Sequence, residues 1–510
     1  MSPDSKRSQS IWTSARMPQS KPLSAHLKTE ILVIGAGMAG LSTAYELAGK
    51  GHNVVVVDRG RIGRGMTART SAHLSWEIDD FYFEVINAHG TNVAKRYFES
   101  QKAALDRIEA ICAEERIACD FARIDLFYLA SNSGGRTALE KEQRALRELG
   151  IGEIDFDDAP IEGAARDALR FPDQARFHAL RYLSGLARAL VRRGVQIYCD
   201  TPIEEITEST RNVRAVAENG SIITAKAAVT ATNTSLVNRV AIHEKQAPYR
   251  SYVIAAPIKK GNAPDILLWD TADPYHYVRI QPGEKYDFLI VGGEDHKTGE
   301  ADDALARRDR LYAWTRERFP GVGPIEFFWS GQIIEPVDYL PFVGRSPNHK
   351  RIYFISGDSG EGLTTGVAAS LILPDLIAGK NHPWAKAYAP NRKTSKPSVA
   401  ATYVKDFVGA MKHVVERVIP DLKTAEDLKP GQAAIVTENK KKIAAYRDDR
   451  GNLHKHQASC THAGCVVQWN SFERCWDCPC HGSQFAPRGQ VLNGPAMHAL
   501  RPAEEKSKSR

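Results

Sequence analysis

The chain has 510 residues, of which 43% are hydrophobic and 25% are charged. This length corresponds to roughly three folding units, and the composition excludes disorder as the main state. The net charge of +7 comes from 68 basic and 61 acidic residues spread along the chain, which differs from the concentrated basic stripe of a nucleic-acid-binding protein. No apolar run approaches the roughly 18 residues that a membrane span needs, and the polar N-terminus lacks the apolar core of a secretion signal. We therefore expect a cytoplasmic protein with no membrane span and no nucleic-acid partner.

The first 28 residues predict an extended arm, with Trp12 as a candidate anchor to the body and a disordered tail as the alternative. Residues 30–34 and 53–57 are short apolar runs typical of buried strands, and residues 38–50 between them have helical spacing. These segments predict a βαβ unit, the building block of a doubly wound parallel sheet. The further segments that we expect in the same sheet or in its helices are 182–193, 195–198, 227–231, 351–356 and 363–378.

Two other patterns follow along the chain. Residues 246–335 alternate apolar and polar side chains with many aromatics, as an antiparallel sheet with one covered face does. Short strands and turns from Gly431 onward predict a small all-β module.

The expected fold class is α/β, with a discontinuous Rossmann-like domain, an antiparallel-sheet substrate domain and a small all-β C-terminal domain. The expected boundaries are 1–28 for the arm, 29–245 (with a helical insertion at about 80–170) and 336–384 for the Rossmann-like domain, 246–335 for the substrate domain, 385–430 for a linker and helix around 403–419, and 431–510 for the all-β domain.

A glycine-rich turn marks a dinucleotide site. Gly35, Gly37 and Gly40 lie between the first strand and the first helix, where glycines allow a tight turn and the close approach of backbone to a pyrophosphate. Asp58 ends the second strand and supplies a carboxylate for ribose hydroxyls. The agreement of strand, glycines, helix and acid predicts a bound dinucleotide, and the alternative is a tight turn with an exposed aspartate.

Several separated segments indicate which dinucleotide is bound. Residues 58–72, 194–197, 338–344 and 357–364 resemble the D-amino-acid oxidase and glycine oxidase family of flavoproteins. The resemblance implies FAD. It places residues 357–364, which we call the late glycine segment, against the isoalloxazine, and the chain near Ile203 against the adenine. The family's usual glutamate after the second strand is replaced by Asp58. The residues expected to bind FAD are Gly35, Gly37, Gly40, Asp58, Arg59, Ile203, Gly357, Gly360, Gly362, Leu363 and Thr364.

Five of the eight cysteines fall close together near the C-terminus, from Cys460 to Cys480, interleaved with His462 and His481. In a cytosolic chain such a cluster indicates metal. The Cys-x-His and Cys-x-x-His spacings are also compatible with a tetrahedral Cys2His2 zinc site, which is one alternative for this cluster. No role is assigned to Cys475.

The pattern Cys460-Thr-His462, followed by Cys478-Pro-Cys480-His481-Gly-Ser483, resembles the Rieske proteins. The resemblance implies a [2Fe–2S] cluster held by Cys460, His462, Cys478 and His481, with a disulfide between Cys465 and Cys480. Histidine ligands reduce the net negative charge of such a cluster and raise its reduction potential. Ser483 is positioned to donate a hydrogen bond towards a cluster sulfur, residues 494–496 would form a covering third loop, and Phe485 stands where high-potential relatives carry a tyrosine.

A flavin accepts two electrons as a hydride, whereas a single [2Fe–2S] cluster passes one at a time, so both in one chain indicate conversion between the two. We expect oxidation of the C–N bond of an amine or amino acid, with electrons leaving through the cluster to an external acceptor. The candidate substrate-lining residues are Tyr277, Arg279, His296 and Arg250, the last of these for a carboxylate.

Two other functions remain as alternatives. A flavin and Rieske reductase without an amine substrate would be favoured by a second glycine fingerprint for NAD, which we do not find. A Rieske oxygenase would need two further histidines and a carboxylate as a mononuclear iron triad, and no convincing set is evident.

Overall fold

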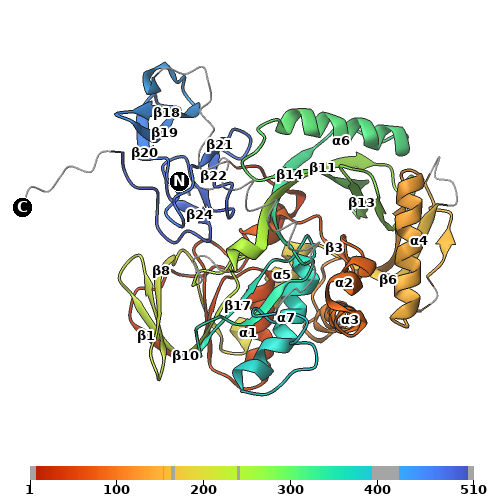
Figure 1. The fold of residues 1–510 in the computed structure, drawn as a ribbon, viewed down its shortest axis with the longest axis horizontal. Helices are drawn as coiled ribbons and strands as arrows, with labels where there is room; N and C mark the ends of the chain where they lie inside the picture. The colour runs from red at the N-terminus through yellow and green to blue at the C-terminus, as the bar shows by residue number, and fades with distance from the viewer. Residues whose placement is uncertain (1–6, 153, 162–166, 238–241, 393–423, 504–510) are drawn as a thin grey trace, which may run out of the picture.

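The computed structural model describes residues 7–152, 154–161, 167–237, 242–392 and 424–503. Within these ranges the chain forms two large sheets and a smaller C-terminal β-module (Figure 1). The helix expected around residues 403–419 lies outside the described residues.

The first sheet is the predicted parallel sheet. Its main path runs β16-β17-β10-β1-β2-β7, in which β17, β10, β1, β2 and β7 are mutually parallel and β16 is an antiparallel edge strand. A hairpin of β8 and β9 pairs with β10. The strands are β1 (Leu27–Ile34), β2 (Val54–Val57), β7 (Gln196–Tyr198), β8 (Ile203–Glu208), β9 (Val213–Ala217), β10 (Ile222–Thr230), β16 (Phe342–Arg345) and β17 (Ile352–Ser356). The expected α/β fold with a discontinuous parallel sheet is confirmed.

Both faces of this sheet are covered, which explains why its strands are continuous apolar runs. Ile31 and Val33 belong to the core shared with helices α1 (Met38–Gly49), α5 (Ala179–Arg192) and α7 (Gly362–Ile377). Leu32 and Ile34 belong to the core shared with β8 and β9 on the other face. Helix α1 contacts both α5 and α7, so the helices follow one another across the sheet (Figure 1).

The second sheet contains the predicted antiparallel strands and more. Its order is β15-β11-β14-β13-β12-β4-β6-β3, with β5 paired to β6. Its strands are β3 (His73–Leu74), β4 (Ala122–Leu129), β5 (Phe156–Asp157), β6 (Ala168–Arg176), β11 (Gln246–Ile258), β12 (Leu267–Asp270), β13 (His276–Gln281), β14 (Asp287–Lys297) and β15 (Phe327–Pro336). Helix α6 (Ala304–Arg318) contacts β11 and β14.

The segment expected as a helical insertion contributes to this second sheet. It does contain α2 (Tyr82–His89), α3 (Thr91–Glu114) and α4 (Ser133–Glu148). It also contains β4, which pairs in parallel with β12. The sheet therefore extends well beyond residues 246–335, because chain from the insertion completes its far side.

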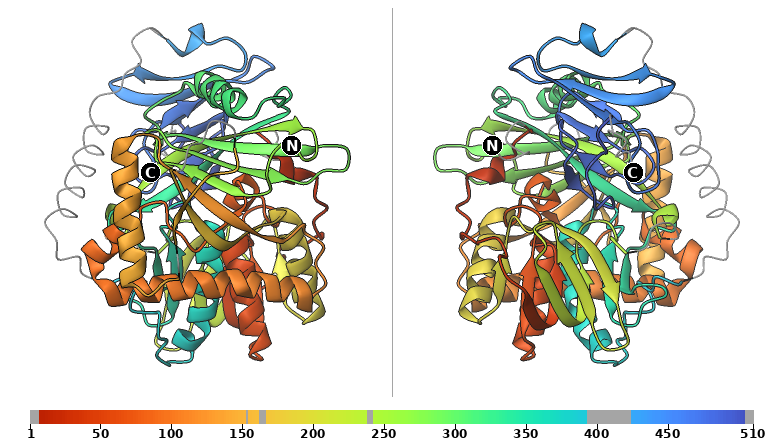
Figure 2. Two further views of the ribbon diagram at one scale, coloured as in Figure 1. Left: turned by 90° about the vertical axis from the view of Figure 1, so that its right-hand side faces the viewer. Right: turned by 90° about the vertical axis from the view of Figure 1, so that its left-hand side faces the viewer.

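The C-terminal module consists of two small sheets, β18-β19-β20 and β21-β22-β23-β24. Their strands are β18 (Ala433–Glu438), β19 (Lys441–Arg447), β20 (Leu453–Gln457), β21 (Gln468–Asn470), β22 (Cys475–Asp477), β23 (Gln484–Phe485) and β24 (Val491–Asn493). The module, drawn in blue, lies across the green strands of the second sheet (Figure 2). One contact between them is that of the Phe328 and Phe472 rings, whose centroids are 4.4 Å apart. Short 3-10 turns complete the fold at η1 (Ile11–Ser14), η2 (Met66–Arg69), η3 (His243–Lys245) and η4 (Ala425–Asp427).

The described part of the N-terminal arm is fixed to the body. Trp12 is fully buried, its indole N–H donates a hydrogen bond to the carbonyl of Thr70 at 2.6 Å, and its ring meets His178 edge to face. Further along the arm, Ser184 donates to the carbonyl of Arg16 at 2.8 Å. The arm therefore covers the η2 turn and the start of α5.

Candidate cofactor and substrate sites

The glycine turn between β1 and α1 is shaped by steric necessity. Gly35 has φ +116°, and a Cβ there would lie 2.2 Å from the carbonyl oxygen of Ala231. A Cβ on Gly40 would lie 1.9 Å from the carbonyl oxygen of Gly35, so only glycine lets α1 approach the turn. Gly35 and Gly37 line a cavity, which we call the cofactor cavity. Gly40 does not line it and contributes through the close packing of α1 on the turn.

Asp58 closes this end of the cavity. Its carboxylate accepts hydrogen bonds from the backbone N–H of Ala36 at 2.6 Å and of Gly60 at 2.8 Å. Burial raises the pKa of Asp58, and the two amide bonds and Arg59 oppose the shift. Arg59 and Ile203 also line the cavity, and the buried Nη1 of Arg59 has no hydrogen-bond partner among the described residues. An unsatisfied guanidinium beside a glycine turn fits a bound dinucleotide, whose polar groups would complete its hydrogen bonds.

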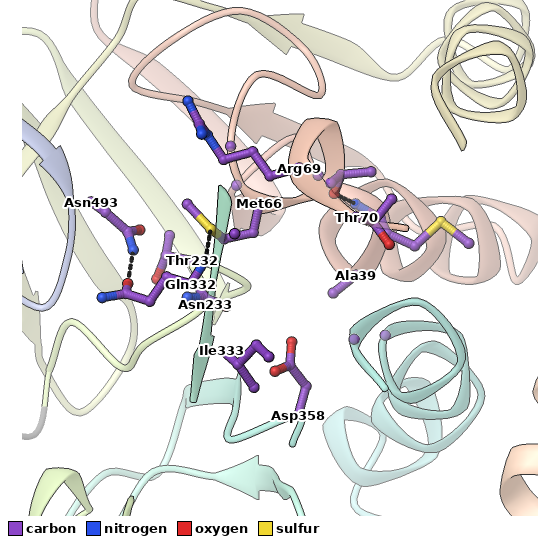
Figure 3. A pocket seen from close by; sticks show the side chains of 18 of the residues that line it. Ala39, Met66, Arg69, Thr70, Thr232, Asn233, Gln332, Ile333, Asp358 and Asn493 are labelled. Atoms are coloured by element: carbon purple, nitrogen blue, oxygen red, sulfur yellow. Dashed lines mark hydrogen bonds between the residues drawn. The ribbon is translucent and has the colours of Figure 1, made fainter. Parts of the chain in front are cut away.

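The late glycine segment lines the same cavity, as Figure 3 shows for Asp358. Gly360, Gly362 and Leu363 line it, and α7 begins at Gly362, so the first amides of a long helix lie at the wall. Two expected residues of this segment do not line it. Gly357 supports the turn with φ +72°, and Thr364 is buried with its hydroxyl donating to the carbonyl of Glu361.

Two further walls of the cavity come from residues that were not among those expected to bind FAD. One is the η2 turn, from which Met66, Arg69 and Thr70 line the cavity (Figure 3). The other is the middle of β15, where Gly331, Gln332 and Ile333 line it. The η2 turn lies in segment 58–72, which carries part of the resemblance to the flavoprotein family, but its residues were not among those expected to bind FAD. The β15 residues carry no motif, and they become a wall only when β15 is placed against the Rossmann-like sheet.

The four candidate substrate residues separate into two groups. Tyr277 lines the cavity, and its hydroxyl lies 2.8 Å from that of Ser251. Arg250, Arg279 and His296 do not line it, which corrects the expectation from sequence.

Each of the three has other partners. Arg250 forms an ion pair with Asp477 at 2.6 Å, with both side chains 1% exposed. Arg279 donates to the carbonyls of Ala72 and Phe177, and His296 lies 3.1 Å from the hydroxyl of Tyr252. No described arginine from this group is therefore available to a substrate carboxylate.

The expected cluster ligands lie on two loops of the C-terminal module, which follow β20 and β22. The Cys460 and Cys478 thiols share a hydrogen bond, which lowers the pKa of Cys460 to about 7 against the effect of burial. The rings of His462 and His481 lie 4.9 Å apart, edge to face. The buried Nδ1 of His481 has no hydrogen-bond partner among the described residues. The thiol pair and the imidazole pair come from the same two loops, and two thiols with two imidazoles form a donor set that fits the diiron cluster.

A disulfide and several hydrogen bonds hold the two ligand loops in place. A disulfide joins Cys465 to Cys480 and so ties the two ligand loops together. The Ser483 hydroxyl accepts from the N–H of Ala496 at 3.0 Å and also hydrogen-bonds Cys460, lowering its pKa. Cys475 is fully buried, and its thiol lies 3.4 Å from Asp477.

The two sites share a wall through Gln332. Its side chain donates to the carbonyl of Gly482 at 3.0 Å and accepts from the Asn493 side-chain amide at 2.7 Å. Its backbone N–H donates to the sulfur of Met66 at 3.3 Å, and Figure 3 shows these side chains around the cavity. Since Gly482 follows His481 directly, a residue that lines the cavity contacts a ligand loop.

A third histidine, His243, lies between the body and the expected cluster ligands. It is 2% exposed, and its ring centroid lies 4.8 Å from that of His462 and 5.7 Å from that of His481. Its place beside these ligands could not be predicted from sequence, because nothing in its local spacing distinguishes it from an ordinary core histidine.

Buried charges hold the module in this position. Glu473 accepts hydrogen bonds from Arg69 at 2.8 Å, Ser330 at 2.6 Å and Ser8 at 2.5 Å, and Arg7 lies 3.4 Å from its other oxygen. Burial alone would raise the pKa of Glu473, but Arg69 and then Arg7 lower it to about 2. The arm, the η2 turn and β15 therefore meet the C-terminal module at one carboxylate.

Comparison with known proteins decides the family. The sequence model of FAD-dependent oxidoreductases of the DAO family matches residues 30–376. The chain belongs to this family. The Rieske [2Fe–2S] domain model matches residues 419–504, so the cofactors are FAD and a [2Fe–2S] cluster, and the zinc alternative is set aside.

The relatives share one or both parts. The chain is 31% identical over 497 residues to the putative Rieske 2Fe-2S iron-sulfur protein YhfW of Bacillus subtilis (strain 168), covering 96% of each chain. It is 24% identical over 375 residues to gamma-glutamylputrescine oxidoreductase of Escherichia coli (strain K12), covering 70% of this chain and 85% of the relative.

Solved structures share the fold of the FAD-dependent oxidoreductase part. The crystal structure of glycine oxidase from Geobacillus kaustophilus has a TM-score of 0.59 at 17% identity, covering 72% of this chain and 99% of that one. L-proline dehydrogenase from P. horikoshii has a TM-score of 0.59 at 18% identity, and the match covers 72% of this chain and 98% of that one. In the part of our chain that the structure describes, no helix is long and apolar enough to cross a bilayer. The cytoplasmic location stays a prediction.

Proposed function

We propose that this FAD-dependent oxidoreductase oxidises the C–N bond of an amine or amino acid, and that the electrons leave through the Rieske cluster to an external acceptor. When bound, FAD takes up a hydride and the cluster carries single electrons. The substrate loses that hydride from the carbon and a proton from the nitrogen. Water hydrolyses the resulting imine to a carbonyl compound and ammonia, or to a carbonyl compound and an amine where the nitrogen carries a second carbon substituent. The names of relatives that act on amines and amino acids support this reaction class.

The residues proposed to hold the cofactors follow from the cavity and the ligand loops. Gly35 and Gly37 leave room for the pyrophosphate, Asp58 offers its carboxylate to the ribose, and the first amides of α7 stabilise negative charge on the ring system. The proposed cluster ligands are Cys460, His462, Cys478 and His481.

The observation that carries the electron-transfer part of the proposal is the contact of Gln332 with Gly482. Gln332 of strand β15 lines the cofactor cavity. Its side-chain amide also donates a hydrogen bond to the loop that carries His481. The buried ion pairs Arg250–Asp477 and Arg69–Glu473 keep the two parts in this arrangement. A short, fixed separation is what repeated single-electron transfer needs.

The test is anaerobic mixing of the purified holoprotein with a panel of amines and amino acids. Flavin absorbance and the EPR signal of the reduced cluster are followed together. We expect at least one amine to bleach the flavin and then to produce the cluster signal. Reduction by a pyridine nucleotide, with no reduction by any amine or amino acid, would contradict the proposal in favour of the reductase alternative.

A further inference from the structure

A second hollow lies beside the cofactor cavity, and we call it the acidic hollow. The two spaces share four lining residues, which are Asp79, Tyr275, Ile333 and Gly360. The acidic hollow is otherwise lined by the chain before α2, by β4, by the start of α4 and by the turn after β12. The shared residue Tyr275 packs against Tyr277 of the cofactor cavity, with ring centroids 5.8 Å apart.

The charge of the acidic hollow is one-sided. Asp79, Asp80, Asp270 and Glu335 line it, and no described arginine, lysine or histidine does. Asp270 is paired with His276 at 3.0 Å, and Asp80 accepts a hydrogen bond from Ser359 at 2.8 Å. The carboxylate of Asp79 makes no hydrogen bond or ion pair with a described residue.

Glu361 adds a second unpaired carboxylate, in the cofactor cavity. Its side chain lines that cavity, the residue is 7% exposed, and its carboxylate makes no hydrogen bond or ion pair with a described residue. Burial and the neighbouring Asp79 and Asp358 raise its pKa well above the ordinary value. A buried carboxylate without a partner is costly unless a cation joins it.

None of the positive groups of the cofactor cavity lines the acidic hollow. Its arginines are Arg7, Arg59, Arg64 and Arg69. Arg7 and Arg69 pair with Glu473 at the C-terminal module, and Arg59 and Arg64 follow β2 at the Asp58 end. His73 also lines the cavity, but burial lowers its pKa to about 3 and keeps it uncharged.

Aromatic rings accompany the carboxylates. The Phe81 ring stacks on Tyr128 with centroids 5.2 Å apart, and Tyr128 meets Trp269 edge to face at 5.7 Å. Phe81, Tyr128 and Tyr275 line the acidic hollow. The faces of such rings attract organic cations and also cover methylene groups.

We propose that the acidic hollow and Glu361 select an amine that carries a second positive group and no carboxylate, as a diamine does. This inference deepens the proposed function and rests on it. Glu361 lines only the cofactor cavity, Asp80 lines only the acidic hollow, and Asp79 lines both. Two cationic centres joined by a short apolar chain match this order of carboxylates and aromatic rings. The distal ammonium takes no part in the reaction and serves only for binding.

A matched set of small amines tests the inference with the wild-type holoprotein. The set is 1,4-diaminobutane, butylamine and 4-aminobutanoate, with glycine and L-proline as amino acids. Apparent dissociation constants come from anaerobic flavin bleaching. We expect 1,4-diaminobutane to bind about tenfold more tightly than butylamine, since it gains a charge-assisted contact, and 4-aminobutanoate to bind most weakly. Tighter binding of 4-aminobutanoate, glycine or L-proline would overturn the inference and leave the proposed function standing, whereas reduction by no amine or amino acid would contradict the proposed function itself.

The variant Asp80→Asn separates the acidic hollow from the cofactor cavity, because it keeps the shape of the side chain. We expect it to weaken the binding of 1,4-diaminobutane about tenfold and the binding of butylamine less than about twofold. Asp309→Asn, on the exposed face of α6, is the matched control, and we expect it to change the binding of neither amine. Flavin content and melting temperature report whether each variant folds, and Asp79→Asn is the second variant if Asp80→Asn does not. Equal losses for both amines, or no loss, would overturn the inference.

Tetramethylammonium chloride provides a readout without turnover, since it cannot form an imine by loss of an N–H proton. We expect it to shift the flavin absorbance of the wild type and to compete with 1,4-diaminobutane, whereas sodium chloride at the same ionic strength does neither. An identical effect of both salts would overturn the inference.

Discussion

The side-chain amide of Gln332 donates a hydrogen bond to the carbonyl of Gly482 at 3.0 Å. Gln332 lines the cofactor cavity, and Gly482 follows the expected cluster ligand His481. One residue therefore contacts both functional parts of the chain.

Replacing Gln332 with alanine removes its hydrogen bonds to Gly482 and Asn493. We expect the free energy of unfolding to fall by about 1–3 kcal/mol and electron transfer from flavin to cluster to slow, with FAD and iron contents unchanged. Stopped-flow absorbance under anaerobic conditions measures the transfer rate. Gln143→Ala, in which the lost amide contacts Ile154 far from both sites, is the control. An unchanged transfer rate in Gln332→Ala would count against a role in positioning the two parts.

Replacing Glu473 with glutamine leaves the buried guanidinium groups of Arg7 and Arg69 without their anion. We expect a loss of about 3–5 kcal/mol in the free energy of unfolding, because removing one partner of a buried pair leaves an uncompensated charge. Chemical denaturation followed by flavin fluorescence measures it. Glu426→Gln, which removes an exposed pair with Lys455, should leave the denaturation midpoint nearly unchanged, because exposed pairs contribute little to stability.

The pH dependence of stability provides an independent test of Glu473. Its pKa in the fold is lowered from 4.5 to about 2, so the ionised carboxylate stabilises the fold fully above pH 4.5. This contribution is lost as the pH falls from 4.5 towards 2, at about 1.4 kcal/mol per pH unit. Glu473→Gln should lack this part of the acid sensitivity. Equal acid sensitivity in the two proteins would show that Glu473 is not held ionised.

Cys460→Ser should abolish the cluster and leave FAD binding intact, because the thiolate is a proposed ligand and lies outside the cofactor cavity. Iron and sulfide analysis together with the flavin spectrum measure the two contents. Cys475→Ser is the matched control, since Cys475 contacts Asp477 and is no proposed ligand. Full iron content in Cys460→Ser would refute the ligand assignment, and loss of both cofactors would show that the two parts do not fold independently.

Ser483→Ala should lower the reduction potential of the cluster, because the hydroxyl that hydrogen-bonds Cys460 no longer stabilises added negative charge. Phe485→Tyr should shift the potential in the opposite direction, since it restores the tyrosine that high-potential relatives carry at this place. Redox titration monitored by EPR measures both. A shift of both variants in the same direction would contradict this explanation.

The parts that could be predicted from sequence are those whose residues lie close together in the chain. The turn from Gly35 to Gly40 and the ligand loops around Cys460 and Cys478 carry their function in local spacing. The roles of Arg250 and Gln332 could not be predicted in this way. Alternation along β11 and β15 indicates which side chains share a face, but it does not show that the C-terminal module, rather than a substrate, lies against Arg250.

Strand pairing explains the other difference from the prediction. The segment before residue 170 has helical stretches, and its strand β4 resembles any other apolar run of similar length. Its place beside β12 depends on pairing between residues far apart in the chain. The acidic hollow arises at this junction, so its carboxylates could be recognised as a group only in the fold.

The most direct test is a single-turnover experiment on the holoprotein, in which rapidly frozen samples are examined by EPR after anaerobic mixing with a reducing amine. We predict that the flavin bleaches first and that the reduced cluster signal then grows at a rate independent of protein concentration, as transfer within one chain requires. A cluster that stays oxidised while the flavin is fully reduced, or a rate proportional to protein concentration, would contradict the account.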